Sequence, residues 1–166
     1  MEEDVLLTPG PTPLPPQVRQ ALGRQIIHHR TSRYRAIFKR VVQHMQAVMQ
    51  TSHSVLCLTS SGTGAMEASV VNLLSPQDTA IVVLGGKFAE RWQELCAAHG
   101  MRVVPVPVAY GDAVDPQQVA AALQAHPEAK AVFTTLLETS TGVVHDINAI
   151  GALTRNSQAV LVVDAI

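Results

Sequence analysis

The sequence has few aromatic residues, few charged residues and only two cysteines, and each shortage excludes a class of protein. Aromatic residues make up 4% and charged residues 15% of the 166 residues, and the formal net charge is -1. A chain with so little charge and so few rings is not expected to bind nucleic acid or an anionic membrane surface. Cys57 and Cys96 cannot build a disulfide framework or a metal site alone, so we predict no metal and two buried, reduced thiols.

Long apolar runs are missing as well. No run approaches the ~20 residues that a membrane helix needs. The chain starts with Met1-Glu2-Glu3-Asp4, and this acidic start has the wrong sign for a signal or transit peptide. We therefore expect a cytoplasmic protein without a membrane span. Hydrophobic residues reach 47%, which is enough to bury one substantial core.

The first part of the chain reads as an arm followed by two helices. Each of the five prolines from Leu6 to Pro16 fixes its own φ and disfavours the helical region for the residue before it, so residues 1–16 are predicted to be extended. A short helix is predicted over 16–23. A longer one starts near Arg33, because apolar residues recur from Tyr34 to Met49 at helical spacing. We assign the remainder, residues 17–166, to one domain.

From Ser54 onward, apolar runs typical of strands alternate with helical patterns. Since the strand runs are apolar on both faces, they predict a mostly parallel sheet covered by helices on both faces, a three-layer α/β/α arrangement. The predicted strands are 55–58, 80–84, 102–106, 131–134 and 159–163, and the predicted helices are 64–74, 88–99, 115–125 and 148–155.

Four small motifs follow predicted strands, at the edge of the sheet where open α/β proteins bind ligands. Ser60 to Glu67 offers free backbone N–H groups at a helix start, which suit a phosphate. Phe88 offers an aromatic ring, residues 138–142 offer hydroxyl groups, and Asp164 offers a carboxylate. Each also has an ordinary structural interpretation, as a tight turn, a core ring, a loop or a helix cap. Together they suit a phosphorylated, cationic aromatic ring.

With these motifs the sequence resembles the N-terminal part of class V aminotransferases of the alanine–glyoxylate or serine–pyruvate group. The resemblance rests on Leu7 to Pro13, Ser61 to Glu67, Gly86-Lys87-Phe88 with Glu90-Arg91-Trp92, Glu138 to Val143, and Val163-Asp164-Ala165. It implies the large domain, incomplete here, of a pyridoxal-phosphate-dependent transferase of fold type I. It also implies pyridoxal 5'-phosphate (PLP) as cofactor and a homodimer.

The resemblance also assigns roles to single residues. Asp164 is expected to be the catalytic partner of the pyridinium nitrogen. Phe88 is expected to stack on the cofactor ring, Ser140 to bind near its hydroxyl group, and Gly10 to line the substrate pocket. The remaining cofactor-binding residues are expected at the helix start, where the phosphate is held: Ser61, Gly62, Thr63, Gly64 and Ala65.

The implied reaction moves an amino group from a small amino acid, alanine or serine, to a 2-oxo acid, glyoxylate or pyruvate. The family's Schiff-base lysine and its small C-terminal domain are expected beyond Ile166, so we expect a fragment that is inactive alone. Two alternatives remain open. One is a cysteine desulfurase-like lyase of the same fold, although such lyases usually place a histidine where this chain has Phe88. The other is a non-catalytic phosphate- or nucleotide-binding module.

Overall fold

The computed structural model describes residues 5–166, which divide into a unit that ends at Leu58 and a unit that spans Thr59–Ile166. In the first unit, residues 5–15 form neither helix nor strand, and residues 1–4 of the predicted arm lie outside the described residues. Helix α1 spans Pro16–Leu22 and helix α2 spans Ser32–Val48. Both agree with the predicted helices to within two residues. Neither helix buries a residue.

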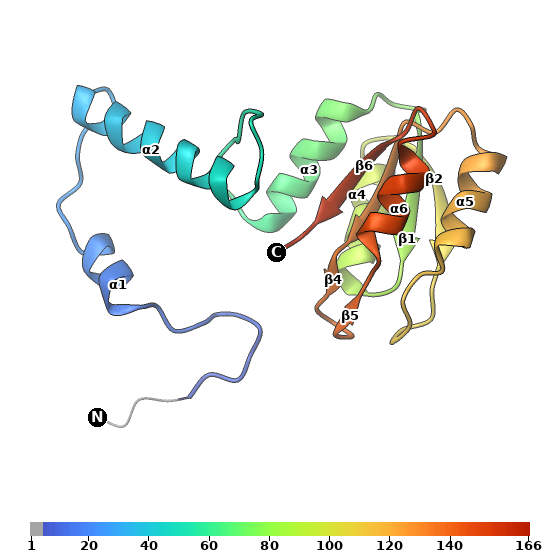
Figure 1. Ribbon diagram of the computed structural model, residues 1–166, viewed down its shortest axis with the longest axis horizontal. Helices are drawn as coiled ribbons and strands as arrows, with labels where there is room; N and C mark the ends of the chain where they lie inside the picture. Colours follow the sequence, from blue (N-terminus) through green and yellow to red (C-terminus); the bar gives the residue numbers. More distant parts are fainter. Residues whose placement is uncertain (1–4) are drawn as a thin grey trace. The chain divides into compact units, whose positions relative to one another are not determined.

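The second unit is built on a four-stranded parallel sheet with the order β2-β1-β3-β6 (Figure 1). The strands are β1 (Thr79–Leu84), β2 (Arg102–Pro107), β3 (Ala131–Thr135) and β6 (Val160–Asp164). The helices are α3 (Gly62–Leu73), α4 (Lys87–Ala98), α5 (Pro116–Ala125) and α6 (Ile147–Thr154). Each of these strands and helices was predicted from the sequence.

Helices cover both faces of this sheet, and the residues of β1 show how. Ala80 and Val82 point to one face, where they pack with α3 and α4, whereas Ile81 and Val83 point to the other, where they pack with α5 and α6. This alternation follows from the two-residue period of a strand. All four residues are fully buried. The predicted three-layer α/β/α architecture is therefore confirmed.

Two predictions for the linking segment before α3 are wrong. Residues 55–58 are not a strand, and the side chain of Leu56 is 82% exposed. A short apolar run forms a strand only where a neighbouring strand accepts its backbone hydrogen bonds, and no strand of the described sheet pairs with it. Cys57 lies in this segment and is exposed, whereas Cys96 of α4 is buried as expected.

The sequence patterns also missed a small antiparallel hairpin after β3. Strand β4 (Leu137–Glu138) pairs with β5 (Val143–Val144) across the turn that holds the predicted hydroxyl motif. Two-residue strands are too short for a periodic signal. Within residues 5–166 no helix is both long and apolar enough to cross a membrane.

Candidate functional site

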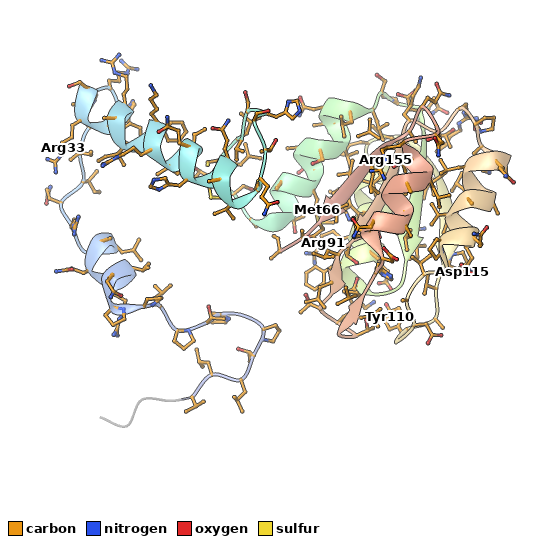
Figure 2. The ribbon with its side chains drawn as sticks, viewed as in Figure 1. Arg33, Met66, Arg91, Tyr110, Asp115 and Arg155 are labelled. Atoms are coloured by element: carbon orange, nitrogen blue, oxygen red, sulfur yellow. The ribbon has the colours of Figure 1, made fainter. Side chains whose placement is uncertain are left out.

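A pocket of about 270 Å³ opens at the carboxyl edge of the parallel sheet, entirely within the second unit. Its walls come from α3, α4, β4 with its turn, and the end of β6. Met66 of α3 and Arg91 of α4, both labelled in Figure 2, lie on two of these walls. The lining residues are Ser61, Gly62, Thr63, Met66, Phe88, Arg91, Leu137, Thr139, Asp164 and Ile166.

One wall is the first turn of α3. Ser61 is the N-cap residue, and its hydroxyl oxygen accepts a hydrogen bond from the Gly64 N–H over 3.4 Å. The first N–H groups of a helix have no partner inside the helix, so this turn presents donors and a partial positive charge. A Cβ atom on Gly64 would overlap the side chain of Ser60. A larger residue at this position would therefore require the Ser60 side chain to move.

The facing wall is the first turn of α4, which follows β1 directly through Gly85 and Gly86. This short connection puts the half-buried Phe88 ring on the pocket wall. Arg91, one turn later, has its guanidinium carbon 5.3 Å from the centroid of that ring. Arg91 also donates a hydrogen bond to Oγ1 of Thr63 over 3.0 Å. The pocket thus combines an aromatic ring, a hydroxyl group and a cation.

Asp164 supplies the negative group of the pocket. It is the last residue of β6 and pairs in register with Thr135 at the end of β3. Its Oδ1 accepts a hydrogen bond from the backbone N–H of Ile166 over 3.2 Å. No cation within residues 5–166 forms an ion pair with this carboxylate. Asp164 is therefore a carboxylate facing a pocket without a charged partner from the described chain.

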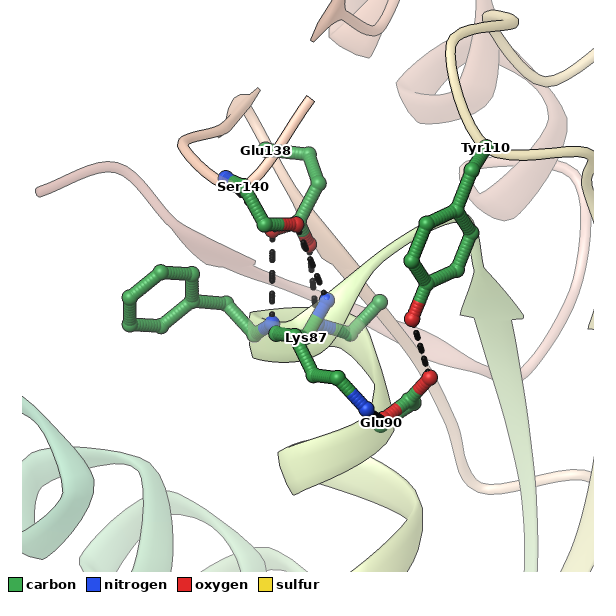
Figure 3. Close-up of polar contacts among 7 residues, drawn as sticks. Lys87, Glu90, Tyr110, Glu138 and Ser140 are labelled. Atoms are coloured by element: carbon green, nitrogen blue, oxygen red, sulfur yellow. Dashed lines mark hydrogen bonds and ion pairs between the residues drawn. The ribbon is translucent and has the colours of Figure 1, made fainter. Parts of the chain in front are cut away.

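The remaining predicted site residues do not line this pocket. Gly64 and Ala65 lie on the first turn of α3 behind the lining residues. The Ser140 hydroxyl forms hydrogen bonds outside the pocket lining: it accepts one from the Lys87 N–H over 3.1 Å and donates one to Glu138 over 2.6 Å (Figure 3). Gly10 belongs to the first unit, and a Cβ atom there would meet nothing within 4 Å. The roles assigned to these residues stay predictions.

The pocket also contains residues that belong to the quoted motifs but were given no role from the sequence. Arg91 and Met66 each lie one helical turn beyond a predicted site residue, so the period of the helix was the available signal. Thr139 lines the pocket in place of its neighbour Ser140. The motif offers both hydroxyl groups, and only the β4–β5 turn decides which one faces inward. Within residues 5–166, no cluster of His, Cys, Asp and Glu side chains could hold a metal ion.

Comparison with known proteins shows the family to which the chain belongs. The family described as "Aminotransferase class-V" matches residues 5–166. A protein of Anabaena cylindrica called the soluble hydrogenase 42 kDa subunit is 42% identical, over 98% of this chain and 43% of that protein. Alanine–glyoxylate aminotransferase of Oryctolagus cuniculus is 32% identical, over 98% of this chain and 41% of that enzyme.

The fold agrees with a solved structure of the same kind. The crystal structure of pyridoxamine–pyruvate aminotransferase from Mesorhizobium loti has a TM-score of 0.92 and 30% identity, and the match covers 96% of this chain and 41% of that one. The chain thus spans less than half the length of each of these relatives. From the match over residues 5–166, the chain belongs to the class V aminotransferase family, whose cofactor is PLP.

Proposed function

We propose that this chain forms the cofactor-binding part of an enzyme that transfers an amino group from alanine or serine to glyoxylate or pyruvate. The observation that carries the proposal is that Thr63, Phe88 and Asp164, from three separate elements, line one pocket. Two of the three relatives above are aminotransferases by name, one for alanine and glyoxylate and one for pyridoxamine and pyruvate. Those names favour transamination over a desulfurase-like lyase or a phosphate-binding module.

The groups around the pocket match PLP in chemistry. The N–H groups and hydroxyls of Ser61 and Thr63 at the start of α3 suit its phosphate. The ring of Phe88 suits its pyridine face, and the carboxylate of Asp164 suits a protonated ring nitrogen. Within the described part of the chain, no cation forms an ion pair with Asp164 that PLP would have to displace. This donor set supports PLP as the occupant of the pocket.

The residues of the chain each have a defined task in the proposed reaction. When bound, PLP supplies an electron sink for the pair of electrons left at the substrate Cα. Asp164 would hold a proton on the ring nitrogen, because a nearby carboxylate favours the protonated form. Phe88 covers one ring face and excludes water from it. The first turn of α3 anchors the phosphate, which fixes the orientation of the ring.

The lysines of the chain do not suit a covalent role at this pocket. The Nζ atom of Lys87 lies 2.6 Å from a carboxylate oxygen of Glu90. The hydrogen bond and charge of Glu90 raise the pKa of Lys87, so its amine stays protonated and is a poor nucleophile. Lys130 precedes β3, where its N–H bonds to Thr79 at the amino edge of the sheet. Lys39 belongs to α2 of the first unit. We propose that the chain alone does not transaminate.

PLP titration tests the proposed function. Trp92 is the only tryptophan of the chain, so its fluorescence reports cofactor binding without a label. We expect the wild-type chain to bind PLP and not ATP. Asp164→Asn should raise the Kd for PLP at least about tenfold, because a charge-assisted hydrogen bond is lost. The exposed Asp112→Asn is the control. Equal binding of ATP, or an unchanged Kd for Asp164→Asn, contradicts the proposal.

An activity assay tests the proposal that the chain alone does not transaminate. The chain is incubated with PLP, alanine and glyoxylate, and glycine formation is measured. We expect none above the rate with PLP alone, and robust turnover contradicts the argument from the lysines. The homodimer implied by the resemblance and the cytoplasmic location expected from the sequence belong to the same proposal.

A further inference from the structure

Glu138 is a fully buried carboxylate that does not line the pocket. It nevertheless accepts hydrogen bonds from Phe88, which lines the pocket, and from the neighbouring Ala89. Its relative exposure is 0%, and within residues 5–166 it forms no ion pair. Instead it accepts backbone hydrogen bonds from Phe88 over 3.3 Å, Ala89 over 3.0 Å and Ser140 over 3.2 Å, and a fourth bond from the Ser140 hydroxyl over 2.6 Å.

These hydrogen bonds keep the carboxylate charged although it is buried. Burial alone raises the pKa of Glu138, but the bonds from Ser140, Ala89 and Phe88 outweigh it and hold the pKa below its ordinary value. The carboxylate also lies at the N-terminus of α4, where the helix dipole favours a negative charge. At neutral pH Glu138 is therefore an acceptor on both oxygens and donates no hydrogen bond.

Glu138 packs closely against the backbone at the start of α4. A Cβ atom on Gly86 would overlap Cγ and Cδ of Glu138, so the backbone lies directly against the carboxyl group. The Lys87 N–H adds a bond to the Ser140 hydroxyl over 3.1 Å (Figure 3). The backbone of residues 86–89 is thereby fixed on both sides of Phe88.

Glu138 differs from an ordinary helix cap in its sequence distance from the helix that it caps. A cap residue normally precedes its helix by one position, whereas Glu138 lies 50 residues after Phe88. It belongs to β4 and adjoins Leu137 and Thr139, which line the pocket together with Phe88. One buried side chain thus connects the part of the pocket wall formed by α4 with the part formed by β4 and its turn.

We propose that Glu138 is a positioning residue for the cofactor site, which acts by fixing the backbone of Phe88 so that its ring faces the pocket. This inference rests on the proposed function, since it assumes that the ring of Phe88 packs on PLP. Glu138 itself does not touch the cofactor.

Glu138→Gln tests the proposal with little change of shape. Glutamine keeps one acceptor oxygen but turns an N–H₂ group toward one of the backbone N–H donors, so at least one bond is lost. We expect PLP binding about tenfold weaker, and amide exchange at Phe88 and Ala89 about tenfold faster. Exchange at Val132 in the centre of the sheet should stay unchanged. Glu94→Gln, at an exposed position of the same helix, is the control.

A double-mutant cycle separates positioning from general destabilisation. In a Phe88→Ala background, Glu138→Gln should weaken PLP binding less than about twofold, because the ring it positions is gone. An equal loss in both backgrounds overturns the proposal, as does unchanged exchange at Phe88. If Glu138→Gln does not fold, Glu138→Asp takes its place with the same expected results. If the wild-type chain does not bind PLP, the proposed function is refuted. The contact of Glu138 with α4 is tested independently of PLP, by amide exchange at Phe88 and Ala89 in Glu138→Gln.

Discussion

Arg91 on α4 donates a hydrogen bond to the hydroxyl oxygen of Thr63 on α3 over 3.0 Å, while its guanidinium carbon lies 5.3 Å from the centroid of the Phe88 ring. One cation thereby contacts two lining residues of the pocket from different helices. Its charge adds to the partial positive charge at the start of α3. The pocket therefore has a positive side formed by α3 and Arg91 and a negative group, Asp164, which is the polarity that a phosphorylated cationic ring requires.

We expect Arg91→Met to raise the Kd for PLP about tenfold, because it removes a charge beside the proposed phosphate site and a cation–π contact with Phe88. Methionine keeps most of the length and apolar packing of the arginine stem. The titration is followed by Trp92 fluorescence. Arg155→Met, on the helix layer that covers the opposite face of the sheet (Figure 2), removes the same charge as a control. Equal affinities of the two variants would contradict a role for Arg91 at the pocket.

Much of the second unit could be predicted because its patterns are local. The apolar run of residues 80–84 indicated a strand buried on both faces, and β1 has that burial. The helix predicted over 115–125 begins with the local sequence Asp115-Pro116-Gln117-Gln118, and the structure has a complete capping box between Asp115 and Gln118. In both cases the signal and the structure involve residues close in sequence.

The errors arise where the outcome depends on distant residues. The run at 55–58 has strand composition, but composition does not tell whether a pairing partner exists. Glu138 carries a charge, which sequence statistics associate with exposure, and yet it is fully buried. Its burial is possible because N–H donors of Phe88 and Ala89, about 50 residues away, meet its oxygens. No local pattern contains that information.

The core between the sheet and α4 should be sensitive to loss of an aromatic ring. Trp92 and Phe133 are buried with ring centroids 4.7 Å apart. We expect Phe133→Ala to lower the free energy of unfolding by about 3–5 kcal/mol, through lost burial and a residual cavity. Val160→Ala, at a position that is half exposed, should cost less than about 0.5 kcal/mol. Urea denaturation measures both, and similar losses would contradict the assignment of Phe133 to the core.

The two cysteines should react with thiol reagents at very different rates. Cys57 is exposed, whereas Cys96 is buried, and burial raises its pKa to about 11. The reactive thiolate of Cys96 is therefore scarce at about pH 8 and also inaccessible. A disulfide reagent should modify one thiol quickly and the second only after denaturant is added. Cys57→Ser should remove the fast phase, and fast reaction of the remaining thiol would contradict the burial of Cys96.

The stability of the second unit should fall in mild acid because of His145. This side chain is 2% exposed, and its Nδ1 accepts a hydrogen bond from the Val114 N–H over 3.1 Å. Burial lowers its pKa from 6.5, although the charge of Glu138 opposes part of the shift. A histidine whose pKa is lower in the folded state contributes stability above pH 6.5 that is lost as pH falls, because the unfolded chain then binds the extra proton.

Urea denaturation from about pH 7 to about pH 5 measures this loss. His145→Asn keeps an acceptor oxygen for Val114 but cannot titrate, so its free energy of unfolding should fall less over this range than that of the wild type. His44→Asn, at an exposed position of α2, should keep the wild-type slope. The comparison is between slopes and not absolute stabilities, since asparagine is smaller and leaves a cavity. Parallel curves for the wild type and His145→Asn would mean that His145 is not the neutral acceptor for Val114.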